Sequence, residues 1–324
     1  MEKYIWGCGR YGKQAFQYFN EKVYGEIKGF IDSKKTGTFL EKNIYNISEV
    51  LTPSSFIIVS VMDYKPIEME LQTRGYRPIK DYILLNSPVK LISVENYIDA
   101  CGNILSGKVE DVSVIMSAVS RIEIGTNVNF GKNVQIICKG FSRIKIGDNS
   151  CIGNNVTITC EDFSNIDLGQ GYICGDNISI EAKHDALISL NDSGAIGSNS
   201  EICVGNSSLI VGKDTDFDKR LVVRTFENSN IEIGDDCMFS YNISIRGSQG
   251  HQILVNGKEK NVRKNVYIAD HVWVGMNVNI LPGTHIRENS VIGAASVLNK
   301  NYDEGSLVVG NGGRIIGNNI NWRR

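Results

Sequence analysis

Four histidines are the side chains best suited to proton transfer in this chain, and one of them stands apart. The unperturbed pKa of histidine, about 6.5, suits a general base near neutral pH. His251 lies in a polar, glycine-containing stretch, whereas His184, His271 and His285 fall at repeat positions that predict surface corners. We therefore expect His251 to be the general base. Asn242, just before the same stretch, is a weaker candidate for contact with a substrate or a developing oxyanion.

A glycine-rich motif near the N-terminus is the second place where chemistry is expected. The sequence Gly-Cys-Gly-Arg-Tyr-Gly follows a short apolar strand and precedes a helix predicted over 13–19. In that context Gly7, Gly9 and Gly12 would let backbone amides approach a phosphate, and Asp32 would hold a ribose hydroxyl. No later residues resemble a hydride-transfer site. A nucleotide or nucleotide-sugar site, an NAD-type site and a purely structural or oligomerising domain all remain open.

The elements around this motif predict a small α/β domain. Apolar strands are expected at 26–31 and 55–61, and a second helix at 67–74. We predict a Rossmann-like domain over residues 1–86. A linker over 87–108, containing a short helix at 94–101, would connect it to the rest of the chain.

A repeat dominates the middle of the chain. Six phrases of the type I-x-I-G end at intervals of 22, 22, 22, 21 and 22 residues, at Gly125, Gly147, Gly169, Asn191, Gly212 and Gly234. This period is typical of a parallel β coil, in which alternate aliphatic residues point inward and glycine, asparagine or aspartate forms the corners. We predict a mainly β fold, a parallel β-helix over 109–310 with one corner widened in each early coil. The tail, 311–324, would cover its end.

The coil is interrupted once and then changes period. From Gly234 to Ala269 the interval is 35 residues, 13 more than one 22-residue coil, and the surplus is polar and contains His251. Function in regular solenoids often lies on such interruptions. Beyond it, the slot at Ala269 recurs at Arg287 and Gly305, each 18 residues on. The 22-residue coils are thus expected to give way to 18-residue coils, with six residues on each side.

Three stretches carry a family resemblance: Ala-Asp-His-Val-Trp-Val-Gly (269–275), Leu-Pro-Gly (281–283) and Val-Ile-Gly-Ala-Ala-Ser-Val (291–297). They resemble the hexapeptide-repeat acyltransferases, left-handed β-helix enzymes that move acetyl groups from acetyl-CoA. That family's catalytic histidine lies in a loop at a similar distance before the motif, as His251 does. The tail 317–324 is similar to the ending of surface-polysaccharide O-acetyltransferases. The 1–86 domain resembles one that precedes the β-helix in some bacterial sugar acetyltransferases and binds a nucleotide-sugar.

The resemblance implies an acetyl-CoA-dependent sugar O-acetyltransferase of capsule or lipopolysaccharide synthesis, acting as a homotrimer. Pantetheine would lie in a groove between two subunits, against Gly275, Gly293 and Ala294. Lys300 and Arg314 would meet the phosphates of CoA, and Trp273 would line the acceptor or pantetheine pocket. These positions are equally suited to coil packing or solvated charge. Transfer would be direct, because no cysteine lies beside His251 in sequence.

Two departures from the family pattern keep other functions open. Many members carry aspartate two residues before the histidine, where this chain has Gln249, so the group that orients His251 is not identified. The family's G-N-P-A-K reads here as Gly-Asn-Gly-Gly-Arg (310–314). The alternatives are an N-acetyltransferase acting on a nucleotide-linked aminosugar, and a non-catalytic β-helix scaffold or binding protein.

Composition narrows the remaining classes. The chain has 324 residues with 34 basic and 36 acidic side chains, and no basic run indicates a nucleic-acid partner. No apolar stretch approaches the roughly 20 residues that span a bilayer, and no signal-peptide pattern is seen, so a cytoplasmic protein is expected. The eight cysteines include no C-x-x-C pair, so no metal site is expected. Cys138 and Cys160, 22 residues apart, are expected to stack in adjacent coils as buried apolar residues.

Overall fold

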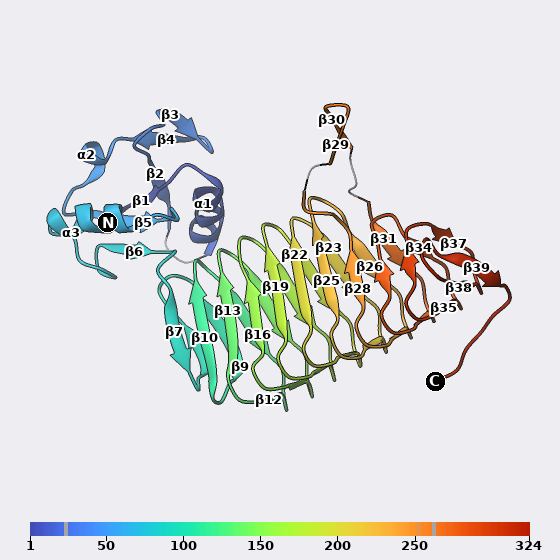
Figure 1. The fold of residues 1–324 in the computed structure, drawn as a ribbon. Coiled ribbons are helices and arrows are strands. Elements are labelled where there is room, and N and C mark those ends of the chain that lie inside the picture. The colour runs from blue at the N-terminus through green and yellow to red at the C-terminus, as the bar shows by residue number, and fades with distance from the viewer. Residues whose placement is uncertain (23–24, 252, 261–263) are drawn as a thin grey trace.

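The computed structural model describes residues 1–22, 25–251, 253–260 and 264–324 as a small α/β domain followed by a long β-solenoid (Figure 1). The solenoid is a left-handed parallel β-helix of about 13 turns, as the repeat predicted. Each turn contributes one strand to each of three sheets, which we call the first, second and third faces in chain order. The first, second and third corners follow the faces of the same number.

The strands are short and stack in chain order on each face. The first face contains β7 (Val89–Ile92), β10 (Val112–Ser117), β13 (Val134–Lys139), β16 (Thr157–Cys160), β19 (Ser179–Lys183), β22 (Glu201–Gly205), β25 (Val222–Phe226), β28 (Ser244–Arg246), β33 (Asn279–Ile280) and β36 (Val297–Leu298). The second contains β8 (Glu95–Ile98), β9 (Ile104–Lys108), β11 (Arg121–Ile124), β14 (Arg143–Ile146), β17 (Asn165–Leu168), β20 (Leu187–Leu190), β23 (Ser208–Val211), β26 (Ile231–Ile233), β31 (Val266–Ile268), β34 (His285–Ile286) and β37 (Asn301–Tyr302). The third contains β12 (Asn129–Phe130), β15 (Cys151–Ile152), β18 (Ile173–Cys174), β21 (Ala195–Ile196), β24 (Asp216–Phe217), β27 (Met238–Phe239), β32 (Trp273–Val274), β35 (Val291–Ile292), β38 (Leu307–Val309) and β39 (Arg314–Gly317).

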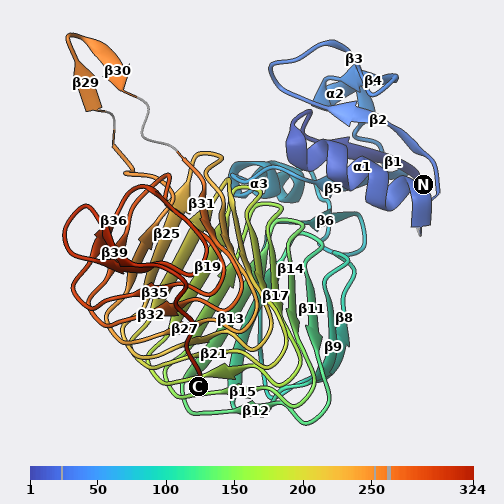
Figure 2. The same cartoon turned by 90° about the vertical axis from the view of Figure 1, so that its right-hand side faces the viewer.

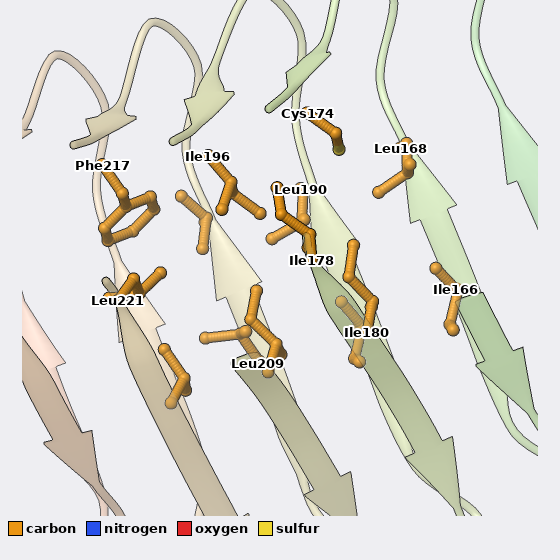
Figure 3. Packing of buried hydrophobic residues seen from close by; sticks show 14 of the residues in the cluster. Ile166, Leu168, Cys174, Ile178, Ile180, Leu190, Ile196, Leu209, Phe217 and Leu221 are labelled. Atoms are coloured by element: carbon orange, nitrogen blue, oxygen red, sulfur yellow. The ribbon is translucent and has the colours of Figure 1, made fainter. Parts of the chain in front are cut away.

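The core of the solenoid consists of aliphatic columns, each residue lying on its counterpart one coil away. Ile166, Ile188 and Leu209 are adjacent in register on the second face, and each is at most 1% exposed. Figure 3 shows how such side chains from the three faces meet in the interior. Cys138 lies opposite Cys160 and both are fully buried, which confirms the predicted stacking. Outward residues alternate with these columns, because successive side chains of a strand point to opposite faces.

The corners are formed by residues that tolerate positive φ. At the third corner, Asn155, Asn177 and Asn199 have φ of 55°, 57° and 61°. The side-chain amide of Asn155 donates to Asn177 at 2.9 Å, and that of Asn177 to Asn199 at 3.2 Å. Asparagine visits the left-handed region more readily than most residues, so these positions serve both corner geometry and coil-to-coil bonding.

The α/β domain is a six-stranded sheet with helices. Its strand order is β3 (Gly37–Phe39), β4 (Lys42–Tyr45), β2 (Ile27–Ile31), β1 (Glu2–Trp6), β5 (Ser55–Val59) and β6 (Tyr82–Leu84), and its helices are α1 (Arg10–Lys22), α2 (Ile47–Val50) and α3 (Lys65–Thr73). β1 pairs in parallel with β2 and with β5. The predicted alternation of strands and helices is therefore present.

This domain packs on the first corner of the early coils. Phe141 and Phe163 stack at 5.6 Å between ring centroids, and the Arg10 guanidinium lies 3.8 Å above the Phe163 ring. Tyr11 donates to the Asp162 carboxylate, and Arg10 pairs with Asp185. The start of α1 is thus an attachment point to the solenoid, and the domain lies beside the coils, not over their end as a cap would (Figure 1).

Three features differ from the sequence-based prediction. The linker at 87–108 forms β7, β8 and β9, so the helix expected at 94–101 is wrong. β7 and β8 pair antiparallel with β10 and β9, and they supply partners to the backbone edge of the first coil. The last coil is shorter than 18 residues, because Ile286 pairs with Tyr302, 16 residues on. Of the tail, only β39 adds to the end, and the residues after it turn back along the side.

Candidate functional site

The 35-residue interval forms a hairpin that leaves the solenoid at the first corner. Its strands, β29 (Ile253–Val255) and β30 (Lys258–Lys260), pair antiparallel. Figures 1 and 2 both show the hairpin and the α/β domain projecting from the same edge of the solenoid. His251 lies in the first limb of this loop and is exposed. Its ring has no hydrogen-bond partner among the described residues, so no orienting group within that part of the chain replaces the missing aspartate.

Asn242 does not lie beside His251. The two residues are at opposite ends of β28, Asn242 at the third corner and His251 beyond the first. A strand rises roughly 3.3 Å per residue, so the five residues from Asn242 to Gly247 span about 16 Å. The Asn242 side-chain amide donates to Asn277 at 2.7 Å, and its φ is 61°. Asn242 therefore continues the corner ladder of asparagines.

Gly275, Gly293 and Ala294 lie together at the third corner of the last coils. A Cβ on Gly275 would lie 2.9 Å from the Ala294 nitrogen, and one on Gly293 would lie 2.7 Å from Val309 Cγ1. The amide of Gly275 donates to Ile292 and that of Gly293 to Val308, both at 2.8 Å. Close coil stacking thus accounts for these glycines, with or without a ligand.

The remaining predicted cofactor residues occupy other places. Trp273 is 37% exposed on the outer surface of the third face, with its ring centroid 6.4 Å from that of Trp322. Arg314 begins β39 and is exposed on the same face. Lys300 is exposed at the first corner, where its carbonyl accepts from His285 at 3.0 Å. Within one chain the predicted residues form two groups, one at the first corner and one at the third corner and third face.

The glycine-rich loop is closed by its own neighbours. Asp32 Oδ2 accepts from the Cys8 amide at 3.2 Å, and Oδ1 accepts from the amides of Lys34 and Lys35 at 2.9 and 3.1 Å. Burial by itself would raise the pKa of Asp32, but these three amides outweigh it and the pKa is lowered. A Cβ on Gly12 would lie 2.0 Å from the Gly7 carbonyl oxygen. A ribose bound at Asp32 would have to compete with three existing bonds.

Sequence reasoning missed a cluster at the second corner that holds the tail. His271, expected to be a surface residue, stacks on Trp322 at 4.3 Å between ring centroids. Its Nδ1 lies 2.6 Å from Asp236 Oδ2, and its Nε2 lies 3.1 Å from the Trp322 carbonyl oxygen and 3.0 Å from Asn321 Oδ1. Arg324 bonds to Asp216 and Asp236 at 2.6 and 3.0 Å. The signal was a tryptophan and arginines in an otherwise polar tail, but their partners lie tens of residues away.

This cluster gives a pH prediction. Burial by itself would lower the pKa of His271, but bonds to Asp236, Trp322 and Asn321 outweigh it and the pKa is raised above 6.5. A raised folded pKa means that the stabilisation is complete below the unfolded pKa and is lost as pH rises through the folded value. We expect Trp322 fluorescence to report progressive release of the tail above about pH 6.5. His271→Gln should flatten this pH dependence, whereas His285→Gln should not. An unchanged transition in His271→Gln would refute the assignment.

Two family models match separate parts of the solenoid. Residues 265–300 match the model described as bacterial transferase hexapeptide (six repeats), and residues 121–160 match the hexapeptide repeat of succinyl-transferase. No helix among the described residues is long and apolar enough to cross a bilayer. The described residues also contain no cluster of three or more His, Cys, Asp or Glu side chains arranged to hold a metal.

Several curated relatives match parts of the chain. A polysialic acid O-acetyltransferase of Escherichia coli O1:K1 is 32% identical over 100 residues, which cover 30% of this chain and 33% of the relative. A galactoside O-acetyltransferase of Lactococcus lactis is 33% identical over 86 residues, 26% of this chain and 41% of the relative. The matches thus span less than half the length of these two relatives. The crystal structure of the polysialic acid O-acetyltransferase OatWY matches with a TM-score of 0.44 and 26% identity, over 63% of this chain and 88% of that one.

Proposed function

Since this chain belongs to the hexapeptide-repeat acyltransferases, we propose that it transfers an acetyl group from acetyl-CoA to a hydroxyl of a sugar in surface-polysaccharide synthesis. The observation that carries the proposal is the placement of His251. The regular solenoid is interrupted at one long loop, and that loop carries a histidine immediately before the matched repeats at 265–300. The names of both relatives above, which are O-acetyltransferases, support a hydroxyl acceptor.

In the proposed reaction His251 takes the proton of the acceptor hydroxyl as its oxygen attacks the thioester carbonyl. The tetrahedral intermediate collapses, the carbon–sulfur bond breaks, and the leaving sulfur receives the proton from the imidazolium. The products are the acetyl ester and free CoA. Direct transfer is favoured over a cysteine acyl-enzyme, because burial raises the pKa of Cys237, in the coil before the loop, to about 12.

The separation of the two groups of residues supports a homotrimer. In a ring built by threefold rotation, each interface joins one surface of a copy to a different surface of the next. The first corner of one copy can therefore face the third corner of its neighbour. In such a ring His251 would stand beside Gly275 and Gly293 of the neighbouring copy, and acetyl-CoA would lie between them. The orienting acceptor for His251 would then also come from across the interface.

Acetyl-CoA turnover, measured by release of free thiol with a panel of sugars and UDP-sugars, tests the proposal. We expect at least one sugar to give turnover, and CoA to raise the melting temperature by binding the native state. Hydroxylamine cleaves an ester product and leaves an amide intact, so treatment of the product separates O-transfer from N-transfer. Absence of both turnover and a CoA-induced shift would replace the proposal with a non-catalytic scaffold.

A further inference from the structure

A row of outward side chains on the first face ends in an unpaired arginine. Arg224 and Arg246 are neighbours in register on β25 and β28. The Arg224 guanidinium bonds to Glu201 through Nε at 3.0 Å and Nη2 at 2.6 Å, so its charge is neutralised. Arg246 forms no hydrogen bond or ion pair with any described residue and is half-buried. It points outward, because the preceding Ile245 is fully buried in the core.

A second unpaired cation stands at the other foot of the same loop. The Lys264 amide donates to the Gly247 carbonyl at 3.3 Å, which places Lys264 across from the residue that follows Arg246. The Lys264 stem passes over the next coil, where a Cβ on Gly283 would meet its Cδ at 2.8 Å. Its ammonium has no carboxylate partner among the described residues. The loop that carries His251 is therefore flanked by a cation at each foot.

The nearest acidic side chain of this row, Glu201, is already committed to Arg224. Two cations left without counter-charge beside a proton-transfer residue are suited to an oxyanion supplied by a ligand. A guanidinium binds carboxylate or phosphate through two parallel bonds, which fixes the orientation of the ligand as well as its position. A lysine adds a point charge without that geometry.

We propose that the acceptor sugar carries an anionic group, a carboxylate or a phosphate, and that Arg246 binds this group with help from Lys264. This inference rests on the proposed acetyl transfer for its biological meaning, but the anion site itself does not require it. Arg246 is a specificity-determining residue in this scheme. It positions the acceptor so that one hydroxyl reaches His251, five residues further along the chain.

The test compares Arg246→Gln and wild type on acceptor pairs that differ only in charge: glucuronic acid with glucose, and glucose 6-phosphate with glucose. Loss of a charge-assisted bidentate contact should raise KM for the acidic acceptor roughly tenfold to a hundredfold. The KM for acetyl-CoA and the kcat should stay nearly constant. Arg246→Lys should recover part of the loss. Arg224→Gln, a matched control whose charge is already neutralised, should change the acidic KM much less. The carboxylate and phosphate arms identify which anion is read.

Binding of the acidic sugars without acetyl-CoA, measured by calorimetry, separates this inference from the proposed function. If acid binding depends on Arg246 but no acetyl transfer occurs, the anion site stands and the acetyltransferase proposal fails. If transfer occurs, but acidic and neutral acceptors have the same KM and Arg246→Gln changes neither, the anion site is refuted.

Discussion

Replacing His251 by alanine is expected to lower kcat for acetyl transfer by about a hundredfold or more, because the acceptor hydroxyl would lose the base that takes its proton. The fold should be unaffected, since the side chain is exposed and has no bonded partner among the described residues. Thiol release at saturating acetyl-CoA, with the acceptor found in the panel, measures the loss. The melting temperature of the variant should match that of the wild type.

His285→Ala is the matched control, because His285 is also exposed but lies on the second face against Tyr267, with ring centroids 6.4 Å apart. It should retain nearly full activity. If His251→Ala keeps its turnover, the family assignment survives but the base must be sought elsewhere. If both variants lose activity to the same degree, a general loss of structure is the better explanation.

A substitution in the middle of the core should have the largest effect on stability. Ile188→Ala is expected to lower the free energy of unfolding by about 2–5 kcal/mol, the usual cost of emptying part of a well-packed core. Ile188 is fully buried between Ile166 and Leu209, and each coil packs on its two neighbours, so the cavity would weaken two interfaces at once. Urea denaturation followed by circular dichroism measures the change.

Ser189→Ala is the control for this prediction, because Ser189 is the next residue and points to the outer surface of the same strand. Its effect should lie within about 0.5 kcal/mol, as for most surface substitutions. Equal destabilisation by the two variants would contradict the inward and outward alternation on which the fold is built.

The solenoid was largely predictable from the sequence because its information is local and repeated. Each coil restates the same alternation, and errors in one coil are corrected by the next. The ends were not predictable in this way. Residues 94–101 have a composition that tolerates a helix, but they lie at the open edge of the first coil, where backbone groups without partners favour strand pairing. Tertiary context therefore overrode local propensity there.

The site was predictable only in part, for a related reason. The loop that carries His251 is visible as a break in spacing, which is a one-dimensional signal. Whether Asn242 or Lys300 lies near it depends on which corner each occupies, and the spacing had to be converted into a three-sided path before that question had an answer. The contact between His271 and Trp322 joins residues 51 apart with no repeat between them. Arg246 was overlooked because its significance is the absence of a partner that Arg224 has.

The regular stacking of coils also fixes a distance. The α/β domain reaches the solenoid as far along as Asp185, and the loop of His251 leaves from Gly247 on the same edge, three coils further on. At about 4.8 Å per coil, these two points are separated by roughly 14 Å. Duplicating or deleting one 22-residue coil between them would change that separation by a single step of about 4.8 Å and leave both ends chemically intact. The number of coils is therefore a ruler between the N-terminal domain and the histidine loop, and a lineage of such proteins can adjust it only in whole increments.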